Sequence, residues 1–150
     1  MLEISRIEVS EIDKVAPLFD AYRVFYKQTS DIAAGTAFLL QRLTSRTAVI
    51  FLAEKDGKPV GFTQLYTTYS SVSMATYFIL NDLFVIPAFR GQGIGQALLE
   101  QAKIHCKQME YKGLALETAI DNAAQQQYER MGWKKDSEYK HYFWENIKSV

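Results

Sequence analysis

Residues 80–99 combine an apolar stretch, a turn with three glycines and an apolar stripe at helical spacing. Gly91, Gly93 and Gly95 lack a Cβ, so they adopt backbone angles closed to other residues and let a ligand approach the main chain. The apolar stripe that begins at Ile94 predicts a helix starting at the turn. Unpaired N–H groups and a partial positive charge at the N-terminus of such a helix bind phosphate. The segment therefore predicts a strand, a phosphate-binding turn and a helix.

Three phosphate-binding motifs compete for this turn, and their spacing separates them. A P-loop ends in Gly-Lys-Ser/Thr, whereas Gln96 and Ala97 follow Gly95 here. A dinucleotide fingerprint needs glycine at its sixth position, which is Gln96, and lies near the first strand of a βαβ unit rather than past mid-chain. The sequence Arg-Gly-Gln-Gly-Ile-Gly after Leu-Phe-Val resembles the pyrophosphate loop of the GNAT-family N-acetyltransferases, with pattern Arg/Gln-x-x-Gly-x-Gly/Ala. Arg90, Gly93 and Gly95 match this pattern, and a glycine-rich turn without a ligand is the alternative.

The composition fits one globular domain and shows no preference for nucleic acid. A chain of 150 residues has the length of one ordinary domain, so we predict a single domain over residues 1–150. Seventeen basic and seventeen acidic side chains cancel, so no strong field attracts nucleic acid or an anionic membrane. No apolar run approaches the ~20 residues of a membrane span, and the N-terminus lacks a signal region. We expect a cytoplasmic protein with neither partner.

The rest of the chain predicts alternating strands and helices. In chain order we expect a strand at 4–9, helices at 11–27 and 31–45, strands at 47–53, 60–69 and 76–85, the helix after the glycine turn, a strand at 114–118, a helix ending at Gly132 and strands at Trp133 and 139–144. This order predicts a mixed α/β sheet of about six to seven strands flanked by about four helices. The GNAT acyl-CoA N-acyltransferase fold has the same order. The resemblance covers residues 48–144, and residues 1–47 match in layout only.

The resemblance implies transfer of the acetyl group from acetyl-CoA to a primary amine, by direct attack in a ternary complex. The acceptor would be a small molecule or a protein lysine, acetyl-CoA the co-substrate, and no metal would take part. Such a reaction needs a polarised carbonyl, a neutral amine and a proton for the departing thiolate. A non-catalytic module that binds or senses acyl-CoA is the alternative. Nothing in the sequence identifies the amine.

The resemblance also implies where the coenzyme binds. In the family, the strand before the loop is splayed from its neighbour, so the N–H groups of Phe84 and Val85 would bind the pantetheine arm and the acetyl oxygen. Asn122 is favoured as a further contact over Asp121, whose negative charge suits phosphates poorly, although a helix-capping role explains both. The pyrophosphate loop would consist of Arg90, Gly91, Gln92, Gly93, Ile94, Gly95 and Gln96.

Tyr128 is the candidate catalytic acid. It lies four residues before Gly132-Trp133, and Tyr-x-x-x-Gly-aromatic resembles the segment in which many family members carry the tyrosine that protonates the coenzyme thiolate. A phenol with an ordinary pKa of about 10 is protonated at neutral pH and donates to a thiolate forming beside it. Tyr128 would then also contact the coenzyme. The alternative is a core position, because Ala124, Tyr128 and Met131 form an apolar helix stripe.

The sequence leaves the general base open. Family members with a carboxylate base on the strand before the loop often have Glu where this chain has Asn81, and an amide accepts no proton at neutral pH. Asp82 is adjacent, but successive strand residues point to opposite faces, so only a β-bulge would re-aim it. A buried structural acid is its alternative role. Glu117 could accept a proton through a water, or the amine could arrive neutral with Asn81 as an anchor.

Aromatic and acidic side chains could bind the acceptor amine, because aromatic faces attract ammonium groups and an acid pairs with them. The candidates are Tyr22, Tyr26, Asp31 and Tyr69. Amphipathic packing explains the tyrosines as well. The aromatic segment 139–144 is expected in the sheet core or in a homodimer interface. His105 and Cys106 are not expected to bind a metal, because no second cluster of ligands accompanies them.

Overall fold

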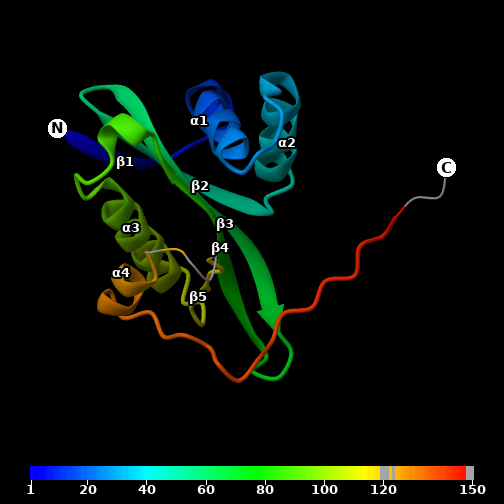
Figure 1. Cartoon of the computed structure of the whole chain (residues 1–150). Coiled ribbons are helices and arrows are strands. Elements are labelled where there is room, and N and C mark those ends of the chain that lie inside the picture. The colour runs from blue at the N-terminus through cyan, green and yellow to red at the C-terminus, as the bar shows by residue number, and fades with distance from the viewer. Residues whose placement is uncertain (119–121, 123, 148–150) are drawn as a thin grey trace. The chain divides into compact units, whose positions relative to one another are not determined.

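The computed structural model describes residues 1–118, 122 and 124–147 of the chain. The chain divides into two compact units, Met1–Leu116 and Glu117–Val150. The first unit contains the β-sheet and three α-helices, and the second contains the helix α4 (Figure 1). None of the helices in the described residues is long and apolar enough to span a lipid bilayer. A single domain over the whole chain stays a prediction.

The sheet is mixed and has five strands in the order β1-β2-β3-β4-β5 among the described residues. The strands are β1 (Leu2–Arg6), β2 (Ala48–Lys55), β3 (Lys58–Ser70), β4 (Ala75–Val85) and β5 (Leu114–Ala115). Neighbours from β1 to β4 run antiparallel, and β5 pairs with β4 in parallel. The turn at Asp56 and Gly57, both with positive φ, joins β2 to β3 as predicted.

The predicted α/β class with a mixed sheet and helices is confirmed, but the predicted number of strands is too high. The described residues 131–147 contain no strand, so the strands expected at Trp133 and 139–144 are absent there. The segment is rich in aromatic residues, as strands are, yet Tyr139, Tyr142 and Trp144 are 76–86% exposed. Aromatic residues favour a strand only where a neighbouring strand and a buried face are present.

The helices follow the predicted order. They are the 3-10 turn η1 (Val9–Glu11), α1 (Ile12–Phe25), α2 (Ile32–Thr44), the 3-10 turn η2 (Pro87–Phe89), α3 (Ile94–Gln108) and α4 (Ala124–Arg130). α1 and α2 lie on one face of the sheet and α3 lies on the other (Figure 1). Because both faces are covered, β2 is buried over its first six residues. The main core joins the face of α1 to the sheet, with Val15, Phe19, Ile50 and Phe62 at its centre.

A β-bulge interrupts the pairing of β3 with β4. Gln64 pairs with Asp82 and Leu65 pairs with Leu80, so Asn81 is an extra residue without a partner on β3. A bulge reverses the alternation of side chains along the strand beyond it. Before the bulge, even-numbered positions such as Phe78 face α3, where the Phe78 ring lies 5.5 Å from that of His105.

After the bulge, even-numbered positions face the opposite layer of helices. The ring of Phe84 lies 6.1 Å from the ring of Tyr22 in α1. Asp82, which would face α3 in a regular strand, is therefore directed towards α1 and α2. The sequence analysis required a β-bulge for Asp82 to face this side of the sheet, and the structure contains that bulge.

Gly61 lets β3 pack closely on β4 at the end of this segment. A Cβ at Gly61 would lie 2.8 Å from the carbonyl oxygen of Phe84 and 3.2 Å from a methyl group of Val85. We expect Gly61→Ala to lower the free energy of unfolding by about 1–3 kcal/mol, because backbone must shift to relieve this overlap. Urea unfolding measures the change. Gly113→Ala is the matched control, since nothing lies within 4 Å of a Cβ there, and equal losses in the two variants would contradict the packing argument.

Candidate active site

The glycine turn connects β4 to α3 and opens the N-terminus of that helix. Gly91 and Gly93 have φ of 78° and 80°, a conformation that favours glycine. Gly93 caps α3 without a side-chain hydrogen bond. A Cβ at Gly91 or Gly93 would meet no atom within 4 Å, so the space beside the main chain is open. In the described part of the chain, the N–H groups of Ile94, Gly95 and Gln96 have no acceptor, which suits an anion.

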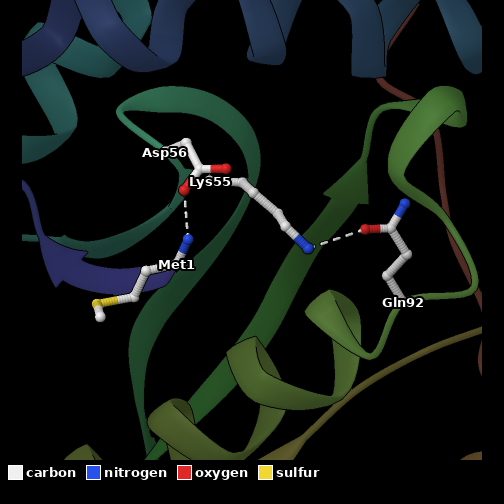
Figure 2. Close-up of polar contacts among 4 residues, drawn as sticks. All are labelled: Met1, Lys55, Asp56 and Gln92. Atoms are coloured by element: carbon white, nitrogen blue, oxygen red, sulfur yellow. Dashed lines mark hydrogen bonds and ion pairs between the residues drawn. The ribbon is translucent and has the colours of Figure 1, made fainter.

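Basic side chains surround this turn. Lys55, the last residue of β2, reaches Gln92 in the turn with an Nζ to Oε1 distance of 3.1 Å (Figure 2). Next to Lys55, the N-terminal ammonium group of Met1 pairs with the carboxylate of Asp56 (Figure 2). This ion pair connects the β2–β3 turn to the start of the chain, and Lys55 brings a positive charge to the turn that the sequence analysis did not assign.

Arg90 directly precedes the first glycine of the turn. Its Nε donates to the carbonyl oxygen of Val85 at 2.8 Å. The guanidinium group lies over the rings of Phe25 and Phe84, 5.4 Å and 5.5 Å from their centroids. The aromatic contacts and the hydrogen bond fix the direction of this cation, and the hydrogen bond uses one of its five donors.

One edge of β4 is open next to the turn. β5 is two residues long and pairs only with Phe78 and Ile79 of β4. Within the described residues, positions 80–85 of β4 therefore have no strand on this edge. The backbone groups that face this edge are available to a ligand.

The direction of each peptide in this segment follows from the strand alternation. The N–H of Ile86 donates to the carbonyl oxygen of Val60 in β3 at 2.9 Å. Because alternate peptides of a strand point the same way, the N–H of Phe84 also faces β3. The N–H groups of Leu83 and Val85 face the open edge. Of the two groups named in the sequence analysis, the N–H of Val85 is turned towards the open edge and that of Phe84 towards β3.

A cavity of about 390 Å³ lies between α1, α2 and the bulged part of the sheet. Its walls are mainly aromatic, with polar groups at the bulge. They are formed by Phe19, Tyr22, Arg23, Ala34, Gly35, Phe38, Tyr66, Asn81 and Asp82. No group of three His, Cys, Asp or Glu side chains among the described residues is arranged to hold a metal ion. The cavity therefore combines four aromatic side chains with one carboxylate, that of Asp82, and one guanidinium group, that of Arg23.

Asp82 is almost fully buried, with 2% of its surface exposed. Its carboxylate accepts hydrogen bonds from the side-chain amides of Asn81, at 2.7 Å, and of Gln64. Its backbone carbonyl accepts a hydrogen bond from Thr63 Oγ1 at 2.8 Å. Burial raises the pKa of Asp82 above its ordinary value, while the hydrogen bonds from Asn81, Gln64 and Tyr22 act in the opposite direction. A carboxylate with a raised pKa is a stronger base than an exposed one.

Two tyrosines in the cavity wall stay protonated. Burial raises the pKa of Tyr22, and the negative charge of Asp82 raises it further. The Tyr22 hydroxyl donates to the carbonyl oxygen of Asn81 at 3.4 Å. Burial and the charge of Asp82 also raise the pKa of Tyr66 to about 12. Both phenols are thus hydrogen-bond donors at neutral pH.

Of the four predicted amine-binding residues, only Tyr22 belongs to the cavity lining. Tyr26 is 57% exposed and packs on Tyr22 with ring centroids 5.1 Å apart. The carboxylate of Asp31 accepts a hydrogen bond from the N–H of Ala34 at 3.0 Å and so caps α2. Tyr69 is 73% exposed near the end of β3 and does not belong to the cavity lining.

The sequence analysis missed most of the cavity wall. Phe19, Phe38 and Tyr66 come from three elements, and only the folded sheet and helices bring them together. Gly35 is buried in α2, where a Cβ would meet the ring of Phe19 at 3.2 Å. A glycine in the middle of a predicted helix is the one signal that could have indicated this close approach.

The remaining predicted residues belong to the second unit. Glu117 is exposed, and its Oε1 lies 3.6 Å from Nδ1 of His141. Asn122 accepts a hydrogen bond from the N–H of Ala124 at 2.9 Å, which is a capping contact at the start of α4. Asp121 lies outside the described residues. Their parts in coenzyme binding or proton transfer stay predictions.

Tyr128 lies on α4, near the end of this helix. Its carbonyl oxygen accepts a hydrogen bond from the N–H of Trp133 at 3.0 Å, and the two rings lie 6.2 Å apart. Gly132, with φ of 92°, follows the helix as the sequence predicts. The Tyr-x-x-x-Gly-aromatic segment therefore forms a compact helix end, while the proton-donor role of Tyr128 stays a prediction.

Comparison with known proteins identifies the family. The sequence model of the Acetyltransferase (GNAT) domain matches residues 46–135. An uncharacterized N-acetyltransferase of Bacillus subtilis (strain 168), YhfO, is 44% identical over 142 residues, which cover 94% of this chain and 95% of that protein. The crystal structure of a probable acetyltransferase matches with a TM-score of 0.90 and 34% identity, covering 98% of this chain and 99% of the other. An aminoglycoside N-acetyltransferase in complex with CoA shares the fold, with a TM-score of 0.81, 18% identity and coverage of 95% and 94%. The chain therefore belongs to the GNAT family and is an acetyltransferase.

Proposed function

We propose that this acetyltransferase moves the acetyl group of acetyl-CoA to a primary amine of a small molecule or a lysine, by direct attack in a ternary complex. The observation that carries the proposal is the β-bulge at Asn81, which directs the buried carboxylate of Asp82 into an aromatic cavity. Three residues beyond Asp82, the N–H of Val85 faces the open edge of β4. A base and an oxyanion donor thus come from one short segment.

Acetyl-CoA would bind along the open edge of β4 and the glycine turn. The turn supplies unpaired N–H groups at the start of α3, and Lys55 and Arg90 supply positive charge for the pyrophosphate. The N–H of Val85 would hold the acetyl oxygen, with that of Leu83 directed at the pantetheine arm. The CoA complex of the aminoglycoside N-acetyltransferase that shares this fold supports the choice of coenzyme.

The reaction balances with the groups of this chain. Asp82 takes a proton from the bound ammonium, and the neutral nitrogen attacks the acetyl carbon. The N–H of Val85 stabilises the negative oxygen of the tetrahedral intermediate. The carbon–sulfur bond breaks, the thiolate takes a proton from Tyr128, and the phenolate regains one from the newly acylated nitrogen. Asn81 holds the carboxylate of Asp82 in place through its 2.7 Å hydrogen bond.

Gly93→Ala should weaken coenzyme binding. Its new methyl group would occupy the open space beside the turn, where the pyrophosphate is proposed to bind, so we expect the Kd for CoA to rise about tenfold or more. Calorimetric titration with CoA measures the Kd. Gly57→Ala is the matched control, because Gly57 has the same φ of 80° and the same open surroundings in the β2–β3 turn. An equal weakening in both variants would sink the assignment of the turn.

Asp82→Asn should remove the base. We expect kcat to fall about 100-fold, a loss typical of general bases. In the wild type, kcat falls as the pH falls through the pKa of Asp82, because the protonated carboxyl accepts no proton. Burial raises that pKa, so this limb lies above the range of an exposed aspartate. In the variant, only titration of the acceptor amine should remain.

The pH dependence of kcat, followed by thiol release, tests this expectation. Asp13→Asn, an exposed position in α1, controls for loss of one negative charge. An unchanged limb in Asp82→Asn would show that another group is the base.

Tyr128→Phe separates catalysis from binding and tests the proposed function as a whole. The wild type should bind acetyl-CoA and release free thiol only when an amine is present. We expect kcat of the variant to fall about 100-fold, because phenylalanine lacks the hydroxyl that would protonate the thiolate. The calorimetric Kd for acetyl-CoA should stay within about twofold of the wild-type value. Tyr139→Phe, exposed in the same unit, is the control. Binding without amine-dependent release in the wild type would instead indicate an acyl-CoA sensing module.

A further inference from the structure

Arg42 lies one helical turn beyond Phe38 on α2, next to the cavity but outside its lining. Gly35, Phe38 and Arg42 follow at intervals of three and four residues, which places them on one helix face. The guanidinium carbon of Arg42 lies 5.2 Å from the centre of the Phe38 ring. Its Nε is buried and has no hydrogen-bond acceptor among the described residues. The terminal N–H groups of the guanidinium, which form the usual fork for a carboxylate, are likewise not bonded to a described residue and remain for an acceptor on a bound molecule.

The charges in and next to the cavity have both signs. Asp82 and Arg23 belong to the lining, and Arg42 lies against the lining residue Phe38. Arg23 donates to the carbonyl oxygen of Thr29 at 3.1 Å, which holds its guanidinium group at the end of α1. Both charges act on Tyr66, because the negative charge of Asp82 raises the pKa of its phenol and the positive charge of Arg42 lowers it.

This arrangement excludes one class of acceptor and favours another. A polyamine or an aminoglycoside would place its second ammonium group against Arg23 or Arg42, where like charges repel. An acceptor with one ammonium and one carboxylate group matches the two ends. The aromatic side chains of the cavity favour an acceptor that also has an apolar portion. The cavity volume of about 390 Å³ is at the low end for ligand pockets, so the acceptor should be small.

We propose that the acceptor is a small amino acid with an apolar portion, whose ammonium group meets Asp82 and whose carboxylate meets the guanidinium group of Arg42. The inference rests on the proposed acetyl transfer and adds the class of substrate. It makes Arg42 a specificity-determining residue, because a guanidinium group holds a carboxylate through charge-assisted hydrogen bonds. The step itself is unchanged, with the carboxylate of the acceptor taking no part in bond making.

The test compares acceptors that differ only in the carboxylate. The wild type is assayed for thiol release with apolar α- and ω-amino acids, with the amide of each, with the amine lacking the carboxylate, and with a polyamine. We expect kcat/KM for at least one amino acid to exceed that of its amide by about tenfold or more. One charge-assisted hydrogen bond accounts for a ratio of this size.

Arg42→Met keeps an unbranched apolar stem and removes the guanidinium group. In this variant the ratio should fall to about two or less, through a higher KM for the amino acid, while the amide and the simple amine keep their constants. Arg46→Met, an exposed position just beyond α2, should keep the wild-type ratio. Calorimetric titration of Arg42→Met with CoA checks that the variant is folded.

Three outcomes would overturn the inference. They are a polyamine or an uncharged amine as the best acceptor, no turnover of any amino acid while another amine is acetylated, and an Arg42→Met variant that loses activity equally with all acceptors. None of these affects the proposed function, because amine-dependent thiol release would still be observed. If no amine in the panel releases thiol, the proposed function itself fails, and the inference fails with it.

Discussion

Asn81 is one residue more than β3 can pair with, and the site depends on how β4 accommodates it. The strand solves the mismatch with a bulge, which exchanges the faces of every residue that follows. Phe78 before the bulge contributes to the layer under α3, and Phe84 after it contributes to the layer under α1. Side chains of one strand therefore pack against helices on both faces of the sheet. The exchange also brings a carboxylate into an apolar cavity, where hydrogen bonds from Asn81 and Gln64 offset part of the cost of burying it.

The open edge of β4 depends on a second mismatch, this time of length. β4 has eleven residues and β5 has two, so pairing on that side ends far from the glycine turn. Backbone groups near Val85 then lie next to a helix N-terminus, where the coenzyme is proposed to bind. Asn81 and Asp82 of the same strand line the cavity proposed for the acceptor. The proposed base and the proposed coenzyme site are therefore adjacent in the chain.

Turns and helix starts could be predicted from the sequence, whereas the register between neighbouring strands could not. The glycine turn and the start of α3 at Ile94 follow from residue types at fixed spacing. The bulge at Asn81 depends on the register with β3, which no local pattern records. For the same reason the cavity was found only in part, because its walls join residues far apart in the chain. The segment 139–144 shows the opposite error, since its aromatic residues suggested a strand without a partner to pair with.

The N–H groups proposed to bind the coenzyme at Leu83 and Val85 belong to the backbone, so side-chain substitutions do not remove them. Scanning this segment with alanine would leave those groups in place and report only losses of packing, as at the buried Phe84. Among the standard amino acids, only proline would delete one of these N–H groups, and proline also restrains the backbone of the strand. Replacement of the peptide by an ester, through chemical or ribosomal incorporation of a hydroxy acid, would reveal the contact.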